Sequence, residues 1–128
     1  RHLNLTHSVR LVKVTNQIEQ AYQSASCFVM SSRYEGLPMV LIEAQSFGLP
    51  IVSFACKCGP RDIITHGDDG YLVEEGDIEA LAKHLLYIIT NDTLRQSMGR
   101  AAQLSATRFD ETNVMNKRET LFSSLLNK

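Results

Sequence analysis

Residues 35–43, with the sequence EGLPMVLIE, decide how this chain is interpreted. A turn containing Gly36 and Pro38 leads into an apolar stretch, and a glutamate stands at each end of the segment. Pro38 suits the first position of a helix, where its missing N–H costs nothing. Glu35 is therefore expected in the loop before a helix, and Glu43 about one and a half turns inside it.

The start of this predicted helix combines two kinds of hydrogen-bonding group. The N–H groups of the first turn have no partner within the helix and attract anions such as phosphate. The two carboxylates can accept hydrogen bonds from sugar hydroxyls. Because Leu41, Ile42 and Ala44 surround Glu43, we expect this acid to be partly buried beside a donor. The segment suits a nucleotide-sugar.

Short apolar runs alternate with helical patterns along the rest of the chain. Strands are expected over residues 9–14, 27–30, 50–54 and 71–73, and helices over 17–25 and 61–66 and after Asp77, Asp92 and Asp110. This order predicts an α/β fold, with a Rossmann-like parallel sheet, flanking helices and a helical C-terminus. Ligands on such sheets bind beyond the carboxyl ends of strands, which is where residues 31–35 are placed.

The composition is that of one globular domain at most. The chain has 128 residues, of which 44% are hydrophobic and 21% charged. A formal charge of −1 predicts no bulk attraction to nucleic acid. No apolar stretch has the length of a membrane span, and the N-terminus lacks the apolar core of a signal peptide, so we expect a cytoplasmic protein.

The cysteines do not form a metal-binding pattern. Cys56 and Cys58 are too closely spaced for a zinc knuckle, and no second pair accompanies them. Cys27 opens an apolar run and is expected to be a buried thiol. All three are interpreted as reduced structural cysteines.

The segment EGLPMVLIEA resembles the donor-site motif of family-4 (group 1) glycosyltransferases, in which two glutamates are separated by seven residues. The resemblance continues through SFGLPIVSF, GPRDII and HGDDGYLVEEGDIEALAKHLLYIITND, in the order found in the C-terminal domain of that family. It extends from about Val9 to Phe109. The resemblance implies the GT-B fold, which has two Rossmann-like domains, and an enzyme that transfers a hexose with retention of configuration.

The resemblance also implies that residues 1–128 form only part of a donor-binding domain. In the family, two further strand–helix units carry a Gly-rich turn and an Arg/Lys pair for the donor diphosphate, and an N-terminal domain binds the acceptor. Neither is found in this sequence. We therefore expect the chain alone to lack transferase activity and to bind nucleotides with a dissociation constant above about 0.1 mM.

Residue roles are carried over from the family motif. Glu35 is the predicted catalytic residue and contacts the transferred sugar, while Glu43 holds the ribose hydroxyls. The predicted donor-binding set is Glu35, Gly36, Leu37, Met39, Val40 and Glu43, with backbone N–H groups facing the sugar or diphosphate. No metal or other cofactor is implied. The implied donor is a UDP-sugar, with GDP-mannose second, and the acceptor is a glycan or lipid-linked sugar in bacterial surface polysaccharide synthesis.

Two positions depart from the family pattern. Lys13 stands where the strand before the first helix usually ends in glycine, at a point where the backbone approaches the nucleotide base. Lys13 and Val14 are therefore the base-proximal candidates. Asp62 replaces the glutamate that the loop after residues 50–54 usually carries.

Other interpretations of these residues stay open. Glu35 could be a solvated loop acid and Glu43 an exposed helix residue, and Arg33 and Arg61 are candidates either for phosphate or for the ordinary surface. A nucleotide-sugar epimerase can share the fold, although the acid–base residues it needs are not found. The non-enzymatic alternative is a degenerate or regulatory nucleotide-binding domain.

For the sheet we predict four parallel strands in sequence order, with residues 9–14 beside 27–30. The helix over 17–25 would supply the right-handed crossover. An open, apolar sheet edge tends to recruit another strand. The competing outcome is that residues 1–15 stay detached, or pair with a second molecule as a homodimer through the exposed edge.

Overall fold

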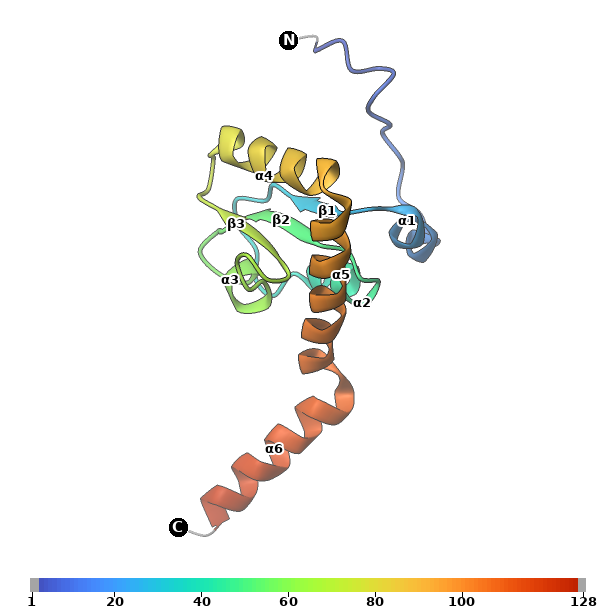
Figure 1. The fold of residues 1–128 in the computed structure, drawn as a ribbon. Helices are drawn as coiled ribbons and strands as arrows, with labels where there is room; N and C mark the ends of the chain where they lie inside the picture. Colours follow the sequence, from blue (N-terminus) through green and yellow to red (C-terminus); the bar gives the residue numbers. More distant parts are fainter. Residues whose placement is uncertain (1–2, 127–128) are drawn as a thin grey trace.

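A three-stranded parallel sheet lies at the centre of the fold (Figure 1). The structure is a computed structural model and describes residues 3–126. Strands β1 (Phe28–Met30), β2 (Ile51–Phe54) and β3 (Gly70–Val73) follow one another in the order β1-β2-β3. Val52 is opposite Val29 on one side and Tyr71 on the other. The Rossmann-like parallel sheet predicted from the alternating pattern is confirmed.

Strand β2 is the buried centre of this sheet. All four of its residues are buried, including the polar Ser53, so the strand does not show the alternation of buried and exposed residues seen in one-sided sheets. Its successive side chains still point to opposite faces. Ile51 packs in a core cluster with Leu41, Ala44 and Ile63. Val52 belongs to a second core cluster, which contains Tyr71, Ile88 and Met98.

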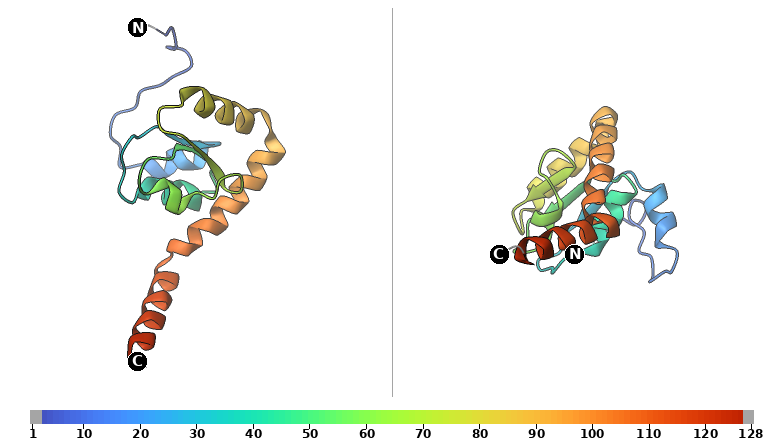
Figure 2. Two further views of the ribbon diagram at one scale, coloured as in Figure 1. Left: turned by 90° about the vertical axis from the view of Figure 1, so that its left-hand side faces the viewer. Right: turned by 90° about the horizontal axis from the view of Figure 1, so that it is seen from below.

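Helices cover both faces of the sheet. In chain order they are α1 (Ile18–Ser24), α2 (Met39–Ser46), α3 (Pro60–Ile63), α4 (Ile78–Thr90), α5 (Asp92–Ala106), the 3₁₀ turn η1 (Thr107–Phe109) and α6 (Glu111–Leu126). Helices α2 and α3 lie on one side of the sheet and α4 lies on the other (Figures 1 and 2). Helix α6 extends away from the sheet and buries no residue.

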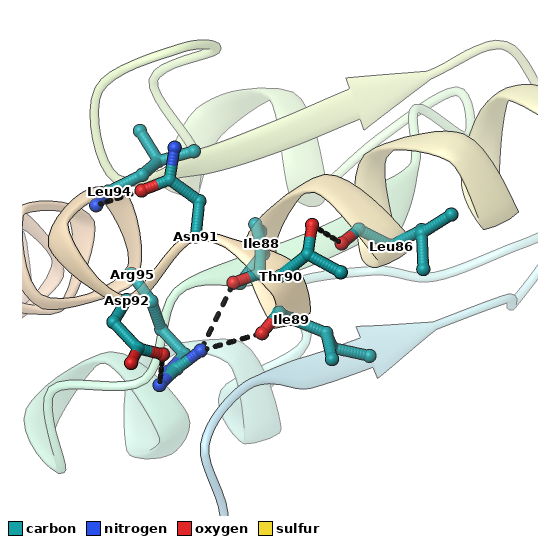
Figure 3. Close-up of polar contacts among 8 residues, drawn as sticks. All are labelled: Leu86, Ile88, Ile89, Thr90, Asn91, Asp92, Leu94 and Arg95. Atoms are coloured by element: carbon teal, nitrogen blue, oxygen red, sulfur yellow. Dashed lines mark hydrogen bonds and ion pairs between the residues drawn. The ribbon is translucent and has the colours of Figure 1, made fainter.

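The junction between α4 and α5 is held by side chains that bond to the backbone (Figure 3). Asn91 caps α5 by accepting from the Leu94 N–H at 3.0 Å, so the cap is one residue earlier than the predicted Asp92. Asp92 instead pairs with Arg95 at 2.5 Å, and Arg95 also donates to the carbonyls of Ile88 and Ile89. Asp77, as predicted, caps α4 through the Ala80 N–H.

Helix α2 is positioned by a very close contact with α5. A Cβ added to Gly99 would overlap the carbonyl oxygen of Gly48, the glycine that ends α2 with a φ of +73°. Only glycine can fill both positions without a clash or strain. Gln103, one turn along α5, donates to the Ser46 carbonyl at 3.5 Å. The helix with the predicted site is thus held against a long, rigid neighbour.

The predicted strand over residues 9–14 is wrong, and the sheet has three strands where four were predicted. This segment has no strand structure and is exposed, with Leu11 at 94% and Val14 at 105% of full exposure. It runs away from the sheet beyond α1 (Figures 1 and 2). Its alternating pattern needs a surface to cover its apolar side chains, and three-residue β1 offers few parallel hydrogen bonds to recruit it.

The outer edge of β3 is closed by the loop that precedes it. Gly67 donates its N–H to the Gly70 carbonyl at 2.8 Å, and the Leu72 N–H donates to Nδ1 of His66 at 3.0 Å. The imidazole therefore stands where a neighbouring strand would otherwise bond. This role differs from the helix-ending position that the sequence suggested for His66.

An aromatic cluster joins β3 to α4. His84 stacks on Tyr71 with ring centroids 4.3 Å apart, and His66 meets both rings edge-on. Burial lowers the pKa of His84 from its ordinary 6.5, and the nearby His66 and Lys83 lower it further. The neutral imidazole is thus the form that this packing favours.

The lowered pKa of His84 predicts a loss of stability in mild acid. Below about pH 6.5 the unfolded chain binds more protons at this site, so the free energy of unfolding should fall as the pH drops towards the folded pKa. His84→Phe keeps an aromatic ring against Tyr71 and removes the titration, so it should flatten this pH dependence. Urea unfolding at about pH 5.5 and about pH 7.5 measures it. His7→Ala, at an exposed histidine, is the control; equal slopes in both variants would contradict the assignment.

Candidate functional site

The predicted site lies at the carboxyl end of the sheet, where residues 31–38 connect β1 to α2. Pro38 is buried and is the N-cap of α2, with φ −76° and ψ 95°, so the helix begins at Met39, one residue later than predicted. An extended ψ at Pro38 turns the chain before the first helical residue. The loop and the first turn of α2 therefore lie beyond the strands, where ligands of such sheets bind.

The first turn of α2 is open at the surface. The exposed fractions of Leu37, Met39 and Val40 are 54%, 56% and 41%, and Gly36 is also exposed. No side chain caps the N-terminus of this helix. Proline has no hydroxyl or carboxylate to offer, so the N–H groups at this end are not covered by a capping oxygen. The Leu41 N–H donates to the Pro38 carbonyl at 3.0 Å, and the N–H groups of Met39 and Val40 before it are of the kind that binds anions at helix starts.

The two glutamates occupy different surroundings. Glu35 is half-buried in the loop, while Glu43 is exposed in the second turn of α2. The partial burial predicted for Glu43 is wrong, because its neighbours Leu41 and Ala44 are buried on another face of the helix. A donor was expected beside Glu43, and the structure shows that it is Tyr22 of α1. The Tyr22 hydroxyl donates to Oε2 of Glu43 at 3.0 Å. Burial, this hydrogen bond and the charge of Glu43 raise the pKa of Tyr22 to about 12. Tyr22 therefore remains a protonated donor at any ordinary pH.

The loop after β2 packs directly on the motif loop. Gly59 has a φ of +84°, and a Cβ there would overlap the Gly36 carbonyl oxygen and the ring of Pro38. The GPRDII segment thus supports the back of the EGLP turn. Arg61, a candidate for phosphate, is instead 3.8 Å from Glu74, and Arg33 is exposed in the motif loop.

Lys13 and Val14, the base-proximal candidates, are not brought to this site. Both are exposed in the segment before α1, which leaves the sheet at the side opposite the motif loop (Figure 1). Because residues 9–14 do not join the sheet, no strand carries them towards α2. The structure assembles the motif residues 35–43 without them.

Cys56 and Cys58 follow β2 on the side of the site, whereas Cys27 directly precedes β1 at the opposite end of the sheet and is only partly buried, not buried as predicted. Cys56 is buried, and its thiol lies 3.6 Å from the Cys58 carbonyl, while Cys58 is exposed. Burial raises the pKa of the Cys27 thiol. Within residues 3–126, His, Cys, Asp and Glu side chains form no group of three that could hold a metal ion. Nor does any described helix have the length and apolarity to cross a bilayer.

Two contributors to the site were missed in the sequence. Tyr22 falls within the helix predicted over residues 17–25, and nothing in its spacing indicates that its hydroxyl reaches Glu43, 21 residues later. Gly59 was noted only as part of GPRDII. Glycine can adopt the positive φ found at this position, but nothing local requires it, and the contact of Gly59 with Gly36 depends on the order of the strands.

The chain belongs to the group 1 glycosyltransferases. Residues 1–105 match the family described as "Glycosyl transferases group 1". One relative is the amylovoran biosynthesis glycosyltransferase AmsD of Erwinia amylovora, which is 37% identical over 114 residues, or 89% of this chain. The chain spans only 32% of the length of AmsD.

Solved structures of glycosyltransferases share the fold. A Staphylococcus aureus TarM mutant, crystallised in a complex that includes UDP, aligns over 93% of this chain and 24% of its own, with a TM-score of 0.84 and 30% identity. Anabaena HepE in complex with UDP-glucose aligns over 94% of this chain and 34% of its own, with a TM-score of 0.79 and 25% identity. The resemblance to GT-B enzymes seen in the sequence is confirmed.

The contact between the two loops makes Gly59→Ala a test of the site's support. The added methyl group would strain a positive φ and displace Gly36, so the amide resonances of Gly36 and Leu37 should shift strongly in a ¹H–¹⁵N spectrum. Gly76→Ala is the matched control, because Gly76 has a φ of +83° and no atom within 4 Å of an added Cβ. If both variants disturb the 36–37 amides equally, the proposed support is wrong.

Proposed function

We propose that this chain binds the nucleoside-diphosphate sugar donor of a retaining hexosyltransferase. The observation that carries the proposal is the geometry of residues 35–43: an acid in the loop, an uncapped helix N-terminus, and a second acid in the second helical turn. The helix N-terminus can bind an anion, and the two acids on either side of it can accept hydrogen bonds from hydroxyl groups. A nucleoside-diphosphate sugar has its groups in this order.

Each group has a role in this proposal. Glu35 accepts hydrogen bonds from hydroxyls of the transferred sugar, and Glu43 accepts them from the ribose. The N–H groups of Leu37, Met39 and Val40 face the sugar or the diphosphate, while Pro38 has none to give. The positive end of α2 stabilises the nucleoside diphosphate as it departs, because negative charge develops there in the transition state.

A UDP-sugar is the favoured donor, with GDP-mannose second. Two related structures were determined with UDP or UDP-glucose, which supports a uridine nucleotide. The acceptor is proposed to be a glycan or lipid-linked sugar bound outside this chain, in bacterial surface polysaccharide synthesis. The amylovoran enzyme among the relatives supports that setting.

The two glutamates should have separable effects on binding. Glu43→Ala should weaken UDP and UDP-glucose alike, whereas Glu35→Ala should weaken UDP-glucose and spare UDP. A lost hydrogen bond to a charged group costs about 1.5–3 kcal/mol, so each effect should exceed about tenfold. NMR titration of the 128-residue chain measures both ligands, with Glu79→Ala on the exposed face of α4 as the control.

Two outcomes would contradict the proposal. Equal UDP affinity in the unaltered chain and in Glu43→Ala would remove Glu43 from the ribose. No spectral change at about 10 mM UDP would mean a Kd well above about 10 mM, and would remove the nucleotide site altogether.

A further inference from the structure

A hydrogen bond ties the helix before the sheet to the helix of the donor motif. Tyr22 of α1 donates its hydroxyl proton to Oε2 of Glu43 at 3.0 Å. Glu43 is exposed, and an exposed glutamate ordinarily samples several side-chain conformations. A fixed donor on a separate element limits this sampling and selects one direction for the carboxylate.

The donor itself is held rigidly. Tyr22 is only 5% exposed, and its ring stacks on Phe47 at 5.4 Å with an interplanar angle of 26°. The ring of Phe28 in β1 also contacts Tyr22, with the ring centroids 6.1 Å apart and the ring planes tilted by 47°. Buried aromatic contacts of this kind fix both ring torsions, so the hydroxyl projects from the core at a defined place. Its position is set by the fold and needs no ligand.

The bond leaves the carboxylate able to serve a ligand. A carboxylate has about four lone-pair positions on its two oxygens, and Tyr22 occupies one of them on Oε2. Oε1 and the second position on Oε2 stay available. Two neighbouring hydroxyls can bind a carboxylate as a pair, but only if its plane is held in the right orientation.

We propose that Tyr22 is a positioning residue, which orients the Glu43 carboxylate so that it accepts both ribose hydroxyls of the donor nucleotide. The proposal rests on the function proposed above and goes beyond it, because it assigns recognition of the ribose diol to a residue outside the donor motif. Tyr22 touches neither the nucleotide nor the reacting atoms. Its effect passes through Glu43 alone.

The test compares two ligands that differ only in the hydroxyls concerned. Dissociation constants for UDP and for 2′,3′-dideoxy-UDP are measured by NMR titration on the 128-residue chain and its variants. The unaltered chain should prefer UDP by about tenfold or more. Tyr22→Phe keeps the aromatic stack and removes the hydroxyl, so it should reduce this preference to about threefold or less while leaving the affinity for dideoxy-UDP unchanged. Tyr87→Phe, at a half-exposed tyrosine on α4, should change neither value.

A merely structural role gives a different result. If Tyr22→Phe weakens both ligands by the same factor, or keeps the full preference for UDP, the proposal is overturned. If the unaltered chain binds UDP but shows no preference over dideoxy-UDP, the ribose role of Glu43 fails and this proposal fails with it. Should Tyr22→Phe not fold, Phe47→Leu serves instead, because it loosens the ring and keeps the hydroxyl. It should lower the preference for UDP, and an unchanged preference would overturn the proposal.

Discussion

The pairing of β2 with a parallel strand on each side is the constraint on which the rest of the structure depends. Parallel strands end at the same edge of a sheet, so the loop after β1 and the loop after β2 meet there. The contact of Gly59 with Gly36 follows from this arrangement. The site is thus built from two loops that are separated in the chain by α2 and β2 and share one end of the sheet.

Elements with a local cause were predictable from the sequence. The β1, β2 and β3 segments are short apolar runs, and Asp77 caps α4 because its carboxylate accepts from Ala80. The start of α2 was located to within one residue by Pro38. Glu35 in a loop and Glu43 inside a helix followed from the same proline. In each case the determining groups lie within a few residues of one another.

Features that depend on distant neighbours were not predictable. The pattern over residues 9–14 is typical of a strand, yet it forms one only beside a long enough partner and under a covering surface, whereas β1 has only three residues and the segment stays exposed. The Tyr22–Glu43 hydrogen bond joins two helices through a core that includes Phe47. His66 reaches Leu72 because the chain reverses at Gly67. Residue types and their spacing along the chain do not predict such contacts.

The two outer borders of the sheet are chemically unequal. On the β3 side, the imidazole of His66 and the N–H of Gly67 already occupy backbone groups of Leu72 and Gly70. On the β1 side, the described residues add no strand beyond Phe28–Met30. Of the two borders, the one beside β1 is therefore the one where no loop of the described residues is seen to take the place of a further strand. Because the backbone groups of Leu72 and Gly70 are already bonded, the β3 edge is protected from pairing with the sheet edges of other molecules.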